Sequence, residues 1–202
     1  MYRQMKGNWI KVYKNTKVDA QMLKDADVDA VILAIGSSPI TIKLEGMDKL
    51  QHASAPEVLR HEVCPKGKVA VIGGGLVGLE TADTLATDGC DVTVLEMKDE
   101  IGSDLGSLRK IAVMMKLQQM QVKMLPNSKV CKFTEEGIVL EDETLVPCNC
   151  AVFAVGFASN DSHLLVEECE KRQIPCRVIG DAKSARRALD AIAEGFEAAR
   201  TL

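Results

Sequence analysis

Aromatic residues are scarce in this chain, where phenylalanine, tyrosine and tryptophan make up 3% of 202 residues. Proteins that hold unpaired bases usually stack them on aromatic rings, so stacking platforms for bases or sugars are excluded as a main theme. Lysine and arginine are not in excess either, because the formal net charge is -4. Without a basic patch to neutralise phosphates, no nucleic-acid partner is predicted.

Long apolar segments are also missing. No run approaches the about 20 residues that cross a bilayer, and the start of the chain lacks the apolar stretch of a signal peptide. We therefore expect no membrane association and a cytoplasmic location. A hydrophobic content of 47% with 27% charged residues is typical of a globular protein with one core or two small ones.

The cysteines form no Cys-x-x-Cys pair, and their number, seven, is odd. A redox-active dithiol and a metal centre are therefore not predicted on this chain. Cys148 and Cys150 stand at the expected entry to a strand, where free cysteine behaves as a small buried hydrophobic residue. His52, His61 and His163 have no carboxylate or cysteine partner nearby in sequence, so no residue is assigned a catalytic role.

A strand-helix-strand unit is the clearest pattern that is present. Residues 69–72 form a short apolar run, three glycines follow, and apolar residues then recur at helical spacing until Gly89. A second β-branched run over residues 92–96 comes directly afterwards. This spacing predicts two parallel strands joined by a right-handed helical crossover, which is the core of an α/β nucleotide-binding fold.

Further elements are expected on both sides of this unit. The continuously apolar run at residues 30–34 predicts a strand covered on both faces. The last helix is expected to begin near Ala185 and to bury the apolar residues Leu189, Ile192, Phe196 and Ala199. The other expected elements are a helix over 108–119, a strand over 122–125, an antiparallel three-stranded meander at 130–133, 138–140 and 145–146, and strands at 151–156 and 177–181.

The three glycines begin the sequence Gly73-Gly74-Gly75-Leu76-Val77-Gly78, which fits the G-x-G-x-x-G pattern. Gly73 permits the tight turn after the strand, Gly75 lets backbone amides approach a pyrophosphate, and Gly78 allows the helix to pack closely on the sheet. The helix N-terminus, with Leu76 and Val77, then offers free N–H groups and the positive end of the helix dipole. A strand before the loop and a helix after it make the pattern a predicted dinucleotide site.

Glu96 ends the strand that follows this helix. A carboxylate at that position accepts hydrogen bonds from a ribose 2'-hydroxyl and repels a 2'-phosphate, so the site is predicted to prefer NAD(H) to NADP(H). Lys98, two residues further on, is the feature that favours NADP(H), although a solvated surface lysine explains it as well.

These blocks, in this order, resemble the flavoproteins of the pyridine nucleotide oxidoreductase superfamily, in which an NAD(P) domain is inserted into a split FAD domain. The segment Ala34-Ile35-Gly36-Ser37-Ser38-Pro39 is similar to the exit from the first FAD segment, and Ala154-Val155-Gly156 to the return crossing. Ile179-Gly180-Asp181 resembles the second FAD motif, whose aspartate binds the ribityl chain. The resemblance also implies that Glu80 points toward the nicotinamide carboxamide.

The resemblance implies an α/β fold in which a Rossmann-like NAD(P) domain with an antiparallel meander is inserted into a partial FAD-like domain. The expected boundaries are 1–65 and 149–202 for the two FAD-like segments and 66–148 for the NAD(H) domain. The first FAD fingerprint is absent and Ile35 replaces the usual threonine, so FAD is expected in the full-length protein rather than in this chain alone.

Within the superfamily, the glycine loop and the last helix look most like the C-terminal part of old yellow enzyme-like NADH:flavin oxidoreductases, such as 2-enoate and 2,4-dienoyl-CoA reductases. Members carry an N-terminal barrel with FMN and an iron-sulfur cluster, so we expect this chain to be a fragment of such an enzyme that passes hydride from NADH to a flavin. Two alternatives stay open: a NADH oxidase or disulfide reductase relative, and a non-catalytic scaffold that binds ADP or NAD.

Overall fold

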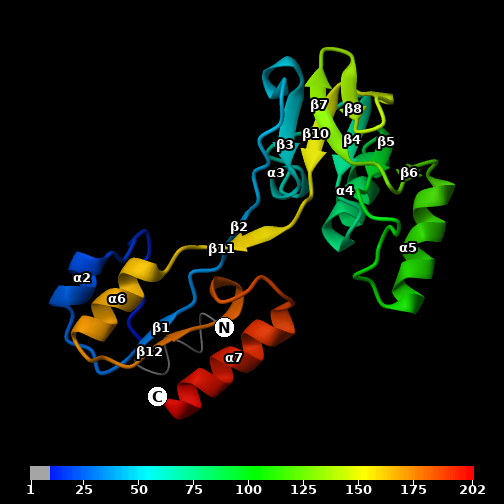
Figure 1. Cartoon of the computed structure of the whole chain (residues 1–202). Helices are drawn as coiled ribbons and strands as arrows, with labels where there is room; N and C mark the ends of the chain where they lie inside the picture. The colour runs from blue at the N-terminus through cyan, green and yellow to red at the C-terminus, as the bar shows by residue number, and fades with distance from the viewer. Residues whose placement is uncertain (1–9) are drawn as a thin grey trace. The chain divides into compact units, whose positions relative to one another are not determined.

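The computed structural model describes residues 10–202, and the expectation that no signal peptide begins the chain lies outside them. The described residues form two compact units, of which one is Ser38–Ala158 and the other combines residues 10–37 with Ser159–Leu202. The two crossings between the units run through β2 (Ser37–Pro39) and β11 (Phe157–Ser159), which pair with each other (Figure 1). No helix in residues 10–202 is long and apolar enough to cross a membrane.

A five-stranded parallel sheet is the centre of the unit Ser38–Ala158. Its strands lie in the order β3 (Gln51–Ser54), β10 (Cys150–Phe153), β4 (Lys68–Ile72), β5 (Asp91–Leu95) and β6 (Lys123–Leu125). In β4, Val71 pairs with Val152 on one side and Val94 on the other, so the strand has neighbours along both edges. The predicted parallel strand pair is therefore confirmed.

One face of this sheet is covered by helices α3 (Ala55–Leu59), α4 (Leu76–Thr87) and α5 (Ser107–Gln119) (Figure 1). Val71 and Val94 point to this face, where they join a core with Leu79 and Leu85 of α4. Burying a leucine or valine side chain contributes about 1.5–3 kcal/mol, so this face supplies much of the stability of the unit. Gly89, with a φ of 85°, follows the end of α4 as predicted.

The other face packs against the antiparallel sheet of β7 (Val130–Thr134), β8 (Gly137–Leu140) and β9 (Leu145–Pro147). Because side chains alternate along a strand, Ile72 and Phe153 point to this second face and form a core with Phe133 and Ile138. The short helix η1 (Met47–Lys49) lies next to β7. The predicted three-stranded meander is confirmed, and with it the mixed α/β fold.

The second unit contains the parallel pair β1 (Val31–Leu33) and β12 (Cys176–Val178) with the helices α2 (Ala20–Asp25), α6 (His163–Lys171), η2 (Gly180–Ala182) and α7 (Ala188–Thr201). The strand predicted at residues 30–34 is present but is not covered on both faces, because Ile32 is 41% exposed. In residues 10–202, β1 pairs with β12 alone, and the side of the strand that carries Ile32 is left partly open.

The last helix also differs from the prediction. α7 begins at Ala188, and Leu189, Ile192 and Phe196 are exposed instead of buried, as is Ala199. The helix turns its small residues inward, because Ala191 lies against Gly180 and Gly195 lies against Ile179. The large apolar residues therefore form an uncovered stripe along α7.

The units divide at different places from the boundaries expected after residue 65 and before residue 149. The physical reason is β10, which was expected in the FAD-like part but lies between β3 and β4 in the five-stranded sheet. Residues 51–59 and 150–153 therefore pack with the glycine-loop unit, and the crossings fall near Ser37 and Ala158 instead.

Candidate functional site

The glycine loop connects β4 to α4 through a turn that side chains would block. Gly73 has a φ of 109°, its N–H donates to the Leu95 carbonyl at 2.8 Å, and a Cβ placed on it would lie 2.4 Å from the Ala154 carbonyl oxygen. A Cβ on Gly78 would lie 1.9 Å from the Gly73 carbonyl oxygen. The turn and the close packing of α4 thus both require glycine, and the helix begins directly behind the loop.

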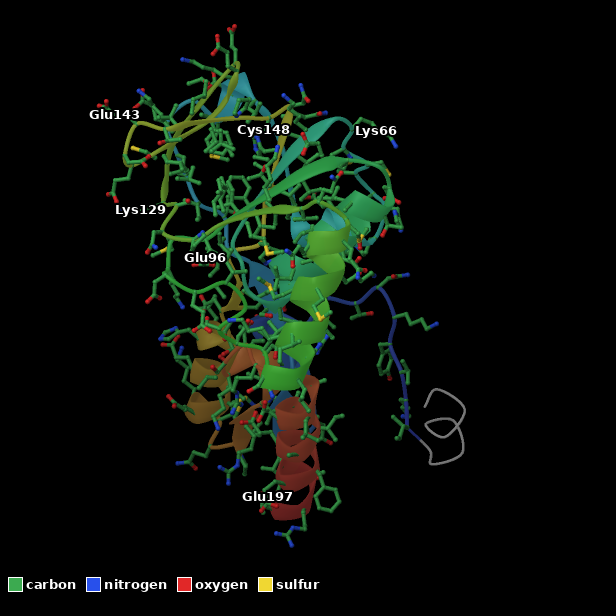
Figure 2. The ribbon with its side chains drawn as sticks, turned by 90° about the vertical axis from the view of Figure 1, so that its right-hand side faces the viewer. Lys66, Glu96, Lys129, Glu143, Cys148 and Glu197 are labelled. Atoms are coloured by element: carbon green, nitrogen blue, oxygen red, sulfur yellow. The ribbon has the colours of Figure 1, made fainter. Side chains whose placement is uncertain are left out.

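Glu96 follows β5 directly and joins the strand end to the glycine loop (Figure 2). Its Oε2 accepts a hydrogen bond from the Gly74 N–H at 2.7 Å, and its Oε1 accepts one from the Lys98 N–H at 2.9 Å. The structure thus brings together Gly73, Gly75, Gly78 and Glu96, four of the residues predicted to bind the dinucleotide. A carboxylate held at this edge of the loop can accept hydrogen bonds from ribose hydroxyl groups.

Asp104 was missed by the sequence analysis. Its Oδ2 and Oδ1 accept from the Leu76 N–H, the first amide of α4, at 3.0 and 3.1 Å. The N-cap residue of α4 is Gly75, which has no side chain to offer, so this carboxylate caps the helix from outside. No motif spacing links an aspartate in the loop after β5 to α4, and only the tertiary structure reveals the contact.

Glu80, which is expected to point toward the nicotinamide, lies on the exposed side of α4. Its Oε1 accepts a charged hydrogen bond from the Arg109 guanidinium of α5 at 2.8 Å, with the two side chains 49% and 59% exposed. An ion pair this exposed contributes little to stability. Whether Glu80 meets a nicotinamide stays a prediction.

In the second unit, three of the residues predicted for the flavin lie close together. The Asp181 carboxylate accepts hydrogen bonds from the Ser37 hydroxyl at 3.1 Å and from the Arg186 N–H at 3.3 Å. Gly36, Gly180 and Asp181 line a cavity of about 380 Å³. Gly156, a further predicted cofactor-binding residue at the return crossing, belongs to the other unit, where its carbonyl accepts from the Ile40 N–H at 3.0 Å.

Glu194 of α7 holds this second site in place and was also missed by the sequence analysis. Its carboxylate accepts a charged hydrogen bond from Arg186 and a second one from the Gly180 N–H at 2.7 Å. Together these contacts lower the pKa of Glu194 from its usual 4.5 to about 2, and the hydrogen bond from Arg186 has the largest effect. Gly180 has a φ of 61°, which glycine adopts without strain, and the hydrogen bond from its N–H ties this turn to α7.

Replacement of Glu194 by glutamine is expected to destabilise the protein at neutral pH, because the folded state then loses its preference for the ionised carboxylate. Since the folded pKa is depressed, this contribution is present above the unfolded value of 4.5 and is lost as the pH falls toward about 2. Urea midpoints of wild type and Glu194→Gln should therefore differ at neutral pH and converge in acid. Glu197→Gln, on the same helix, is the control and should leave the midpoint unchanged.

Two of the buried cysteines, Cys148 and Cys150, have thiols of low reactivity. Cys148, marked in Figure 2, and Cys150 are 5% and 1% exposed, and burial raises the pKa of each thiol to about 11. Both thiols are therefore protonated at neutral pH and pack as apolar groups. In residues 10–202, no cluster of three or more histidine, cysteine or acidic residues could hold a metal ion.

Comparison with known proteins extends over nearly the whole chain. A family model described as pyridine nucleotide-disulphide oxidoreductase matches residues 2–182. A bilirubin reductase of Mediterraneibacter gnavus is 36% identical over 91% of this chain and 29% of its own length. A cinnamate reductase of Clostridium sporogenes is 33% identical over 96% of this chain and 29% of its own length.

Among solved structures, a 2-naphthoyl-CoA reductase in complex with 2-naphthoyl-CoA has a similar fold, with a TM-score of 0.87 and 24% identity. The match covers 100% of this chain and 31% of that protein. The chain thus spans less than a third of the length of these two reductases.

Proposed function

The chain belongs to the pyridine nucleotide-disulphide oxidoreductase family, and on this premise we propose that it is the NAD(H)-binding part of an enzyme that passes hydride from NADH to a flavin. The chain resembles reductases of the enoate type, and proteins of the family use FAD and NAD(H). When bound, the nicotinamide and the flavin supply the hydride chemistry, while protein residues bind and orient them.

The observation that carries this proposal is the combination of the glycine loop with Glu96 at its edge. Gly75 leaves the N-terminus of α4 without a side chain of its own, which suits a pyrophosphate. The Glu96 carboxylate, held by the Gly74 N–H, suits a ribose with a free 2'-hydroxyl. A 2'-phosphate would meet this negative charge, so NADH is the expected coenzyme.

A flavin would be held in part by the second unit. Gly36 and Gly180 leave room beside the cavity, and the Asp181 carboxylate, positioned by Ser37, can accept hydrogen bonds from flavin hydroxyl groups. The remaining flavin contacts would come from outside this chain, because the relatives are more than three times as long. Gly156 keeps its proposed role as part of the crossing that leads back to this unit.

The apolar stripe on α7, formed by Leu189, Ile192 and Phe196, is a candidate contact surface for a further part of the same protein. These residues are 76%, 68% and 71% exposed and recur at helical spacing on one face. An exposed apolar patch usually marks a surface that another domain covers. We propose that the rest of the enzyme, including its substrate site, packs here, and that the substrate is an enoate or an enoyl thioester, as the name of the cinnamate reductase suggests.

Calorimetric titration of the chain with NADH, NADPH, ADP and FAD tests the proposal. We expect NADH to bind at least about tenfold more tightly than NADPH, which corresponds to about 1.4 kcal/mol, and FAD not to bind the chain alone. Equal affinity for ADP and NADH would mean that the nicotinamide contributes nothing, and would favour a nucleotide-binding scaffold. Failure of both ADP and NADH to bind would contradict the proposed function.

A further inference from the structure

The loop between β5 and α5 is folded onto the glycine loop. The Gly102 N–H donates to the Gly74 carbonyl at 2.7 Å, and the side chain of Ile101 is buried, 5% exposed, in the core beneath. A turn from Gly102 to Leu105 then brings Asp104 over the start of α4. The position of Asp104 is therefore set by backbone and core contacts on both sides of it.

Asp104 reaches an amide that a bound dinucleotide would also need. Both carboxylate oxygens lie within 3.1 Å of the Leu76 N–H, and a Cβ on Gly75 would lie 3.2 Å from Oδ2. In loops of this type the pyrophosphate rests on the same first amides of the helix. The single Leu76 N–H cannot serve both acceptors, and a carboxylate and a pyrophosphate repel each other at this distance.

We propose that Asp104 is an affinity-determining residue of the dinucleotide site, because it competes with the pyrophosphate for the N-terminus of α4. The inference rests on the proposed function and adds a cost to binding: the Asp104 carboxylate must leave Leu76 before the pyrophosphate can enter. In the ligand-free protein the same carboxylate stabilises α4, since a negative charge is favourable at a helix N-terminus. Asp104 therefore raises the stability of the ligand-free protein and lowers the affinity of the site for a dinucleotide.

Asp104→Asn tests the competition, because asparagine keeps the shape of the side chain and removes its charge. Charges at a helix N-terminus are worth roughly 0.3–2 kcal/mol, so calorimetry of the full chain should give NADH binding between about twofold and thirtyfold tighter than in wild type. Asp99→Asn is the control, because it removes the same charge from the same exposed loop. Its NADH affinity should stay within about twofold of wild type.

Thermal unfolding without ligand supplies the second measurement. Asp104→Asn should lower the melting temperature by a few degrees, because α4 loses its anionic cap, whereas Asp99→Asn should not. A purely structural role would instead lower both the melting temperature and the NADH affinity.

The outcomes separate this inference from the proposed function. If wild type binds NADH and Asp104→Asn binds it equally or more weakly, Asp104 does not compete with the pyrophosphate, and the proposed function stands. If both proteins bind NADH and Asp104→Asn binds it more tightly, both are supported. If neither protein binds NADH, both are overturned.

Discussion

Replacement of Gly78 by alanine is expected to destabilise the protein by about 3 kcal/mol, the upper end of the usual cost of overpacking, and to abolish NADH binding. The new Cβ would lie 1.9 Å from the Gly73 carbonyl oxygen, and the contacting atom belongs to the backbone of the glycine loop. Neither atom can rotate away, so α4 has to move off β4. The same movement carries the helix N-terminus away from the loop. Urea unfolding followed by circular dichroism measures the first effect, and calorimetry with NADH the second.

Gly195→Ala is the matched control, because it makes the same substitution inside another helix. A Cβ there would lie 3.8 Å from the nearest Ile179 atom, an ordinary contact. Since alanine favours helix over glycine, this variant should be as stable as wild type or up to about 1 kcal/mol more stable, with unchanged NADH affinity. A Gly78→Ala protein of wild-type stability would show that the helix does not need its close approach to the loop.

Replacement of Glu96 by arginine is expected to reverse the coenzyme preference. The substitution removes the carboxylate that a ribose hydroxyl would contact and places a cation where a 2'-phosphate would lie. Hydrogen bonds to charged groups contribute about 1.5–3 kcal/mol, so the ratio of NADPH to NADH affinity should rise at least tenfold and up to about hundredfold. Parallel titrations of wild type and variant with both coenzymes measure this ratio.

Two controls separate the charge of Glu96 from its structural contacts. Asp99→Arg makes the same change of charge in the exposed loop nearby and should leave the ratio unchanged. Glu96→Gln can still accept the hydrogen bond from the Gly74 N–H but lacks the charge, and should lie between wild type and Glu96→Arg. An unchanged ratio in Glu96→Arg would show that Glu96 only ties the loop to β5.

The sequence alone was sufficient to predict the α/β fold, because its signals are local. A strand with neighbours on both sides needs a short apolar run such as residues 69–72, and a chain that turns tightly and meets a helix at close range needs glycine at positions 73 and 78. Short segments after Pro126, separated by acidic residues, likewise predicted the meander. Glu96 was identified as a site residue by its spacing from the loop, and the structure places its carboxylate on that loop.

Contacts between distant segments, and the burial that depends on them, were decided by the tertiary structure. Asp104 accepts a hydrogen bond from the Leu76 N–H, 28 residues away in the sequence, and Glu194 accepts one from the Gly180 N–H, 14 residues away. No sequence period connects partners at these separations. The apolar spacing of α7 predicted a buried face, but which face is buried depends on the surface that is present to receive it. In the described residues that surface accepts the small side chains, so the large ones are left exposed.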